Sequence, residues 1–215
     1  MPDENNFETN KISELLNEFI VNIKDNTLIV NNAIRLENEG ISALFSKKMR
    51  DYIIDCSFLK MCTLWEQYLE RLFISFMLKN RSESTCGFSC YVSPIDDKHA
   101  YNLICNVNNY PDWSDCDKVL IWTNLFFDGN CPLLKLSGFK GDVKQLQKIR
   151  NHIAHNSEKS KATFLELQRN LGVLPASNTT AELLSLTKPP KKNQIKYYDY
   201  YAELLEDVAK LFAEI

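Results

Sequence analysis

Apolar residues recur every three or four positions over most of the chain, and this spacing predicts amphipathic helices. The first predicted helix spans about residues 9–38, and Gly40 favours its end. Asn26 and Thr27 interrupt the pattern, which then resumes. The apolar positions of this helix are Ile12, Leu15, Leu16, Phe19, Ile20, Ile23, Leu28, Ile29, Ala33, Ile34 and Leu36.

The longest periodic stretch covers residues 42–80, with Ser42 as its candidate N-cap. A helix of this length with a wide apolar stripe buries that stripe only against several other helices. The stripe is made of Leu44, Phe45, Met49, Tyr52, Ile53, Cys56, Leu59, Cys62, Trp65, Tyr68, Leu69, Leu72, Phe73, Phe76 and Met77.

Residues 81–113 break the helical pattern. Polar and turn-forming residues open this segment, and its candidate strands are Tyr91-Val92 and Leu103–Cys105. We therefore predict an irregular insertion at 81–113.

The remainder of the chain returns to helical spacing. A short helix is predicted over 115–127, and 131–140 connects it to a helix that opens at Asp142. Helical spacing then continues to a stop at Gly172, and a helical turn is expected near 181–186. The last predicted helix spans 194–215, where we interpret the tyrosines between 197 and 201 as packing residues.

These elements together predict an all-α protein. The expected fold is a mainly antiparallel bundle of about five helices, in a single domain over residues 1–215. Only six glycines and seven prolines argue against a turn-rich all-β fold. A basic loop at 187–194, kept extended by its prolines, precedes the last helix.

Composition and charge narrow the functional classes. The net charge of −3 excludes an overall basic field, so RNA contacts must come from a local patch or a dimer groove. The longest uncharged apolar run, Leu72 to Leu78, is too short to span a membrane. No secretion signal is visible at the acidic N-terminus, so we expect a cytoplasmic protein with no membrane association.

Seven cysteines, an odd number without a disulfide-like rhythm, predict reduced thiols. Cys86 and Cys90 are four apart, and together with Cys105, Cys116 and His99 they suggest a zinc site. One cysteine pair without a second close pair is a weak zinc signal, so we expect neither a metal nor another cofactor.

Chemistry-bearing residues concentrate near the end of the helix that opens at Asp142. Arg150, Asn151, His152 and His155 lie within six residues. Arg150 falls at the margin of the helix's apolar face, and Asn151 and His155 lie four apart on one border of it. An arginine offers paired donors to phosphate, and a histidine moves protons near neutral pH. The apolar face consists of Val143, Leu146, Ile149, Ile153 and Ala154.

At these residues the chain resembles the HEPN superfamily. The family motif is Arg, a polar residue that is often Asn, about three spacers and then His, which here is Arg150-Asn151 followed by His155. The resemblance implies a small helical bundle that dimerises through the motif helix. It also implies a metal-independent RNA endonuclease of a prokaryotic defence or toxin system, whose product carries a 2′,3′-cyclic phosphate. In the HEPN subfamily that pairs with nucleotidyltransferase antitoxins, a Tyr stands two residues after the motif His. Here that position is Ser157, so the chain departs from that subfamily.

The resemblance assigns catalysis to Arg150, Asn151 and His155, with His152 and Glu66 in support. Glu66 lies in the long second helix, and two readings stay open for it: it approaches Arg150 and holds the guanidinium, or it stays in solvent beside Glu70 and Arg71, as exposed Glu residues commonly do. Backbone contacts to RNA are expected from Lys148, Lys188, Lys191 and Lys192. The expected partners are an RNA substrate, a second copy of the chain, and an antitoxin or another defence-system protein.

Two alternatives stay open on the sequence. One is structural: Arg150 forms a salt bridge within the bundle and His155 caps a helix end. The other is a catalytically inactive HEPN dimer that binds a protein or a nucleotide.

Overall fold

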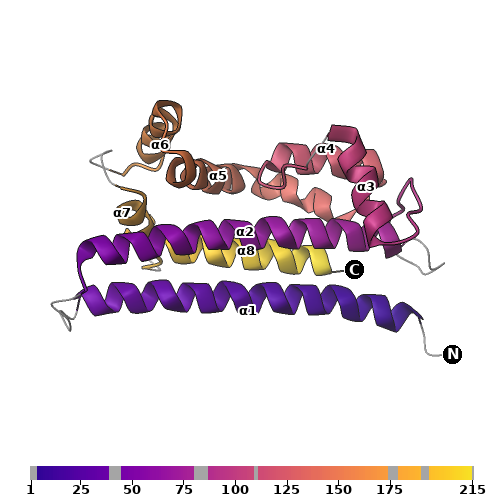
Figure 1. The fold of residues 1–215 in the computed structure, drawn as a ribbon, viewed down its shortest axis with the longest axis horizontal. Helices are drawn as coiled ribbons and strands as arrows, with labels where there is room; N and C mark the ends of the chain where they lie inside the picture. The colour runs from indigo at the N-terminus through magenta and orange to yellow at the C-terminus, as the bar shows by residue number, and fades with distance from the viewer. Residues whose placement is uncertain are drawn as a thin grey trace. The chain divides into compact units, whose positions relative to one another are not determined.

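The structure, a computed structural model, describes residues 4–38, 45–79, 87–108, 111–173, 179–189 and 194–214. Over these ranges it consists of α-helices and one 3-10 helix, with two isolated β-bridges and no strand. This confirms the predicted all-α helical bundle (Figure 1). The elements in order are α1 (Glu4–Asn38), α2 (Lys47–Lys79), α3 (Asp97–Asn108), α4 (Cys116–Phe126), η1 (Pro132–Phe139), α5 (Lys140–His155), α6 (Glu158–Asn170), α7 (Thr180–Ser185) and α8 (Tyr197–Ala213).

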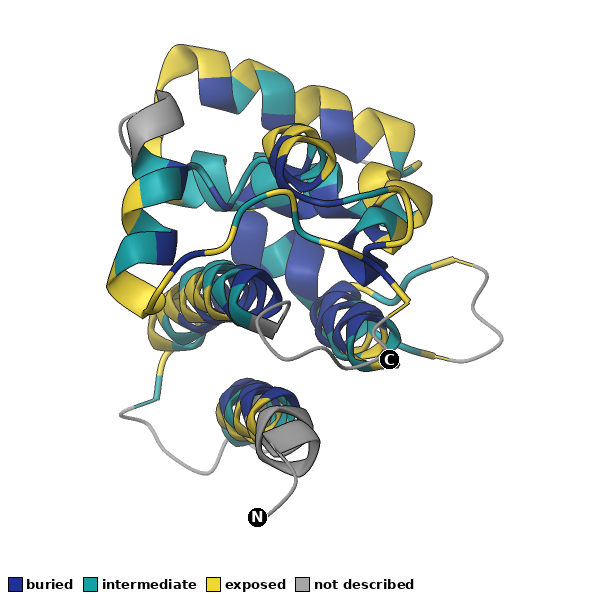
Figure 2. Ribbon diagram, turned by 90° about the vertical axis from the view of Figure 1, so that its right-hand side faces the viewer, coloured by how far each residue is buried: buried dark blue, intermediate teal, exposed yellow. Residues whose placement is uncertain are grey.

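The chain forms two compact units. Unit 1 is made of Met1–Ile20, Trp65–Gly141 and Asp207–Ile215, and unit 2 of Val21–Leu64 and Asp142–Glu206. Helices α1, α2 and α8 contribute residues to each unit. In Figure 2 the buried residues of the long helices gather on the sides that face other helices.

In unit 2, α1, α2 and α8 pack side by side around Asn26 of α1. Its amide nitrogen donates to the carbonyl oxygen of Ser57 on α2 at 2.7 Å and to the hydroxyl of Tyr198 on α8 at 2.9 Å. The ring of Phe58 on α2 also packs edge-on against Tyr198. Helices α1 and α2 run antiparallel, because Arg50 near the start of α2 pairs with Glu37 near the end of α1.

The inward position of Asn26 corrects the predicted apolar face of α1. The helix is continuous through Asn26 and Thr27. Leu28 and Ile29, which we expected inside, are 59% and 54% exposed. The inner positions after Ile23 are Asn26, Val30, Ala33 and Ile34, which keep the 3.6-residue repeat in step.

The predicted stripe of α2 also needs a correction at its N-terminal end. Met49 is 48% exposed, Tyr52 is 72% exposed, and Cys56 is exposed as well. The buried residues in this part of α2 are Ile54, Ser57, Phe58 and Met61. From Leu64 to Met77 the predicted stripe is buried as expected. Ser42, the predicted cap, and Leu44 lie outside the described residues.

Unit 1 has a largely aromatic core. Phe19 of α1 packs against Trp65 and Tyr68 of α2, and Trp65 packs against Phe212 of α8. A second cluster surrounds Phe73 of α2. Its other members are Phe76, Phe88, Trp113, Trp122, Phe126 and Phe127.

The strand predictions within residues 81–113 were wrong. Leu103–Cys105 lies within α3, where Ala100 and Ile104 are buried one turn apart. Near Tyr91 there is an isolated bridge between Cys90 and Phe127, not a strand. An apolar run of three residues fits a strand or a helix equally, and here tertiary packing in unit 1 decides for the helix.

The later elements mostly follow the predictions. Asp115 caps α4, its side chain accepting a hydrogen bond from the amide of Asp117. The predicted connection at 131–140 is largely the 3-10 helix η1. Gly172, at a φ of 69°, follows α6 in the left-handed conformation that ends helices. Tyr197, Tyr198 and Tyr201 are buried, which confirms them as packing residues.

Replacing Asn26 tests the polar contact at the centre of unit 2. Asn26→Ala leaves the Tyr198 hydroxyl and the Ser57 carbonyl oxygen without their donor, so we expect the free energy of unfolding to fall by about 1–3 kcal/mol. Urea titration followed by circular dichroism measures the change. The matched control is Asn32→Ala on the exposed side of α1, expected to change stability by less than about 0.5 kcal/mol. Equal effects of the two substitutions would contradict the role given to Asn26.

Candidate functional site

The motif helix α5 begins at Lys140, directly after η1, and not at Asp142. The prediction that this helix opens at Asp142 is therefore wrong by two residues. The Tyr200 hydroxyl donates to the Asp142 carboxylate at 2.8 Å, and the Tyr201 hydroxyl bonds the Gln145 side-chain oxygen at 3.1 Å. Both side chains thus fasten the N-terminal part of α5 to α8 within unit 2.

The buried face of α5 is shorter than predicted. Val143, Leu146 and Ile149 are buried as expected. Ile153 is only half-buried and Ala154 is exposed, so packing on this face ends one turn earlier. The last turn of α5, which ends at His155, is therefore less buried than the turns before it, and its packed side chain is His152.

Arg150 and Asn151 form a pair at the start of this last turn. Both side chains are half-buried, and the Arg150 guanidinium donates to the amide oxygen of Asn151 at 3.2 Å. Neighbouring helix residues do not normally face each other, so this contact fixes a particular arrangement of the two side chains. Asn151 is therefore placed to orient the guanidinium.

His155 is the last residue of α5 and is exposed. Its imidazole makes no hydrogen bond within the part of the chain that the structure describes. The helix stops there because Asn156 adopts the left-handed conformation, with a φ of 41°, and Ser157 caps α6 by accepting from the Ser160 amide. The side chain of His155 is therefore open to a ligand or to a second protein chain.

His152 faces a different environment. Its ring stacks on Phe164 of α6, with the ring centres 4.6 Å apart and the planes 14° from parallel. Its Nδ1 is buried with no hydrogen-bond partner among the described residues. Burial lowers the pKa of His152, and the positive charge of Lys161 lowers it further. His152 thus acts as a neutral ring that joins α5 to α6.

The other predicted site residues are more scattered. Glu66 lies on α2 in unit 1 and is half-buried, and its approach to Arg150 stays a prediction. Lys148 is half-buried on α5. The Lys188 ammonium lies 3.6 Å from the centre of the Tyr200 ring. Lys191 and Lys192 lie outside the described residues.

Lys188 is thereby linked to the first turn of the motif helix, since Tyr200 also bonds Asp142. Asp142 precedes Arg150 by eight residues, about 12 Å along a helix axis. A hydrogen bond joins Arg150 and Asn151, and the exposed His155 lies further along the same helix without a hydrogen bond to either, whereas Lys188 belongs to the opposite end of α5.

Within the described ranges, no group of three or more His, Cys, Asp or Glu side chains is arranged to hold a metal ion. The six described cysteines are free thiols, and Cys86 lies outside these ranges. His99 takes part in a local turn, where its Nδ1 accepts from the amide of Ile95 at 3.2 Å. No helix among the described residues is long and apolar enough to cross a membrane.

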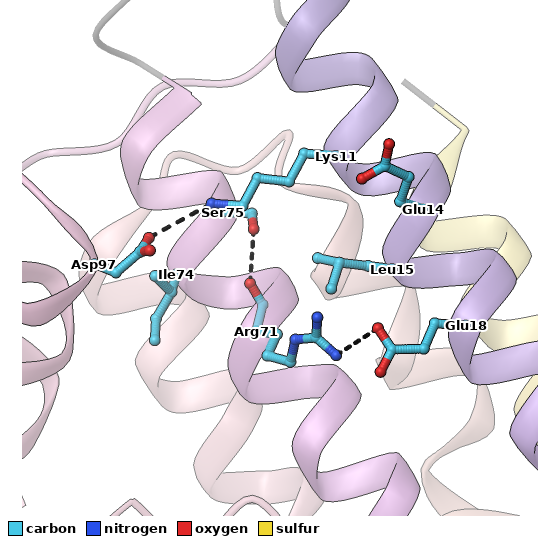
Figure 3. A pocket seen from close by; sticks show the side chains of 8 residues that line it. All are labelled: Lys11, Glu14, Leu15, Glu18, Arg71, Ile74, Ser75 and Asp97. Atoms are coloured by element: carbon cyan, nitrogen blue, oxygen red, sulfur yellow. Dashed lines mark hydrogen bonds and ion pairs between the residues drawn. The ribbon is translucent and has the colours of Figure 1, made fainter.

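Unit 1 contains a pocket of about 410 Å³ between α1 and α2, near the start of α3 (Figure 3). Both of its cations are already engaged with carboxylates. Lys11 pairs with Asp97 at 3.6 Å, and Arg71 pairs with Glu18 at 2.8 Å. None of the predicted site residues lines this pocket, and its neutralised cations give phosphate little advantage there.

Comparisons with protein-family models, with curated proteins and with solved structures gave no match. The function of this chain must therefore be inferred from its own residues.

Sequence reasoning missed Phe164 and Tyr200 as residues that shape the site. Phe164 has helical apolar spacing, which signals burial but not contact with His152. Tyr200 lies 58 residues after Asp142, and no local pattern links two residues so far apart. The polar, chargeable residues of the motif were visible in the sequence, but the residues that hold them were not.

The environment of His152 predicts its titration. Its folded-state pKa lies below that of an unfolded histidine, so between the two values the unfolded chain binds more protons. The contribution of neutral His152 to the free energy of unfolding is complete above the unfolded pKa of about 6.5, and it is lost as the pH falls below that value. Histidine ring signals in NMR, assigned with His152→Gln, should show this low pKa.

Lys161→Gln removes one cause of the shift, so the His152 pKa should rise toward its ordinary value. The matched control is Lys159→Gln, an exposed lysine on the same helix that should leave the titration unchanged. A His152 signal that titrates at or above the ordinary histidine pKa would contradict the buried, neutral ring.

Proposed function

We propose that this protein is a metal-independent RNA endonuclease of the HEPN type. The observation that carries the proposal is the last turn of α5, where a half-buried Arg150–Asn151 pair accompanies an exposed imidazole. The neighbouring imidazole of His152 is stacked on Phe164. One histidine of the motif is thus engaged in packing, and the other remains available for proton transfer.

Each motif residue has a role suited to its chemistry. The Arg150 guanidinium binds the scissile phosphate and stabilises the negative charge that develops on it. Asn151 orients that guanidinium through the 3.2 Å hydrogen bond. His155 removes the proton of the ribose 2′-hydroxyl or protonates the departing 5′-oxygen. Attack of the 2′-oxygen on phosphorus then expels the 5′-oxygen and leaves a 2′,3′-cyclic phosphate.

We further propose that two chains form the complete site. His155 follows Arg150 by five positions, so their side chains diverge by about 140° around one helix. A two-fold pairing of α5 helices brings Arg150 of one chain to His155 of the other. Half-buried Ile153 and exposed Ala154 lie on the last turn of α5, where they are available to a partner helix.

The second candidate function is a catalytically inactive dimer that binds a protein or a nucleotide. Two observations favour it over RNA binding. The net charge is −3, and the described lysine of the basic loop, Lys188, contacts the Tyr200 ring. The same motif geometry serves both functions, so only activity separates them.

The biological setting belongs to the proposal as well. We propose a cytoplasmic toxin or defence nuclease whose activity is held in check by an antitoxin or another protein of its system. An RNA-cleaving enzyme would damage its own cell if it acted without control.

Cleavage of RNA in the presence of EDTA tests the catalytic assignment. The purified protein should cut single-stranded RNA and leave 2′,3′-cyclic phosphate ends, and His155→Ala should abolish the cut. Because His155 is exposed, the variant should melt within a few degrees of wild type. Denaturing gels measure the cut, and circular dichroism measures the melting.

The matched control is His99→Ala, which changes the same residue type in unit 1 and should keep full activity. Equal cleavage by wild type and His155→Ala would remove His155 from the mechanism. A wild-type protein that binds RNA or nucleotide without cutting would support the second candidate function.

Mixing two inactive variants tests the composite site. Arg150→Ala and His155→Ala homodimers should each be inactive. After subunit exchange, half of the dimers are mixed, and each has one intact Arg–His pair, so activity should return to about a quarter of wild type. Light scattering should show a homodimer at micromolar concentration. A monomer that still cuts RNA would contradict the two-chain site.

A further inference from the structure

A groove of about 780 Å³ runs between α1 and α8 in unit 2, away from the residues of the motif. Its α1 side is formed by Lys24, Thr27, Leu28 and Asn31. Its α8 side is formed by Asp199, Ala202, Glu203 and Glu206, with Ile195 just before the helix. Neither the proposed catalytic residues nor the predicted RNA-binding lysines line it.

Helix α1 exposes large apolar side chains in the groove and beside it. Leu28 lines the groove and is 59% exposed. Val21, which is 56% exposed, lies seven residues earlier and therefore on the same face of the helix. Ile29 is also 54% exposed beside them. Large apolar groups that stay in water over two turns of one helix mark a surface for another molecule.

The α8 wall is acidic. Asp199, Glu203 and Glu206 follow one another at spacings of four and three residues, so they form a stripe along one face. Asp199 is fixed by Asn31, whose amide nitrogen donates to it at 3.4 Å. Lys24 is the one cation among the described residues that line the groove. Lys196 lies at its edge, where its ammonium donates to the Asn31 side-chain oxygen at 3.4 Å. With three carboxylates against these two lysines, the groove combines an apolar edge with an excess of negative charge.

We propose that this α1–α8 groove binds a basic amphipathic helix of a partner protein. The partner's apolar residues would pack on Leu28 and on the half-buried Ile195, and its flanking lysine or arginine residues would face Asp199, Glu203 and Glu206. The α1 wall from Lys24 to Asn31 is about 10 Å long, which corresponds to about two helical turns of the partner.

A helix fits this groove better than an extended segment. Every backbone donor and acceptor along the middle of α1 and α8 is already used inside its own helix. An extended segment would bury its own N–H and C=O groups against walls with no backbone partner to offer. A helix satisfies its backbone internally and needs only side-chain complementarity, as when an amphipathic helix lies in an apolar groove.

The charge of the groove also separates it from the proposed nuclease site. Three carboxylates repel a phosphate backbone, so RNA is a poor occupant. A second copy of this groove would bring acidic walls together, so the groove is poorly suited to pairing with itself. The proposal does not depend on the nuclease assignment, because none of its residues belongs to the motif.

Binding of a synthetic peptide tests the proposal. The probe is a fluorescent amphipathic peptide of about 14 residues, with leucine at every third or fourth position and lysine elsewhere on the flanks. Fluorescence anisotropy should show saturable binding that weakens at least about tenfold between about 0.05 M and 0.5 M salt. A control peptide of the same sequence, with glutamate in place of each lysine, should bind at least about tenfold more weakly.

Two groove substitutions and two controls locate the binding. Glu203→Lys reverses an acidic side chain and Leu28→Ser removes the apolar edge, and each should weaken binding by at least about tenfold. The matched controls on exposed positions of α6 are Glu166→Lys and Leu165→Ser, which should change binding less than about twofold. RNA cleavage by the two groove variants should equal that of wild type.

Equal weakening by groove and control variants would overturn the proposal, because binding would then follow net charge alone. Equal affinity for the lysine and glutamate peptides would also overturn it. A second copy of the chain is the remaining alternative occupant, and light scattering tests it. If Leu28→Ser converts a dimer to a monomer, a second copy occupies the groove and the proposal fails.

Discussion

The hydroxyl groups of three tyrosines on α8 set the arrangement of helices in unit 2. Tyr198 and Tyr201 are buried and Tyr200 is half-buried, and the hydroxyl of each has a hydrogen-bond partner on another helix. Tyr198 accepts from Asn26 of α1, whereas Tyr200 and Tyr201 bond Asp142 and Gln145 of α5. Apolar packing alone tolerates small shifts of one helix along another. These hydrogen bonds do not, because each joins a specific pair of side chains. They therefore fix which face of each helix points inward.

The motif helix combines a fixed part with an open part. Its first turns are fastened to α8 and its apolar face is buried, but its last turn is less buried. His152 stacks on Phe164 at the point where α5 passes into α6, which holds that turn in place without occupying His155. A reactive group needs both a rigid support and an open approach. In α5 these two requirements are met by different residues of one helix.

The sequence predicted the helices well because the 3.6-residue repeat is a local signal. Long stretches such as α1, α2 and α8 repeat it many times. Two of the failures involve long-range contacts: Asn26 inside α1, bonded to Tyr198, and Asp142, bonded to Tyr200. A polar residue in an apolar pattern looks like an interruption until its distant partner is known. The motif of Arg150, Asn151 and His155 was visible, because it is short and continuous, but the different states of His152 and His155 depend on the fold.

The orientation of α8 about its own axis determines two features of unit 2. It decides which residues support the motif helix and which residues form one wall of the groove. With Tyr198 directed to Asn26, Tyr200 and Tyr201 meet α5, and the stripe of Asp199, Glu203 and Glu206 forms one wall of the groove. The inward position of Asn26 likewise leaves Leu28 outside, on the opposite wall. A substitution that turns α8 would therefore disturb the support of the motif helix and the groove together. Only outward residues such as Glu203 and Leu28 can change the groove while the contacts that hold α5 remain in place.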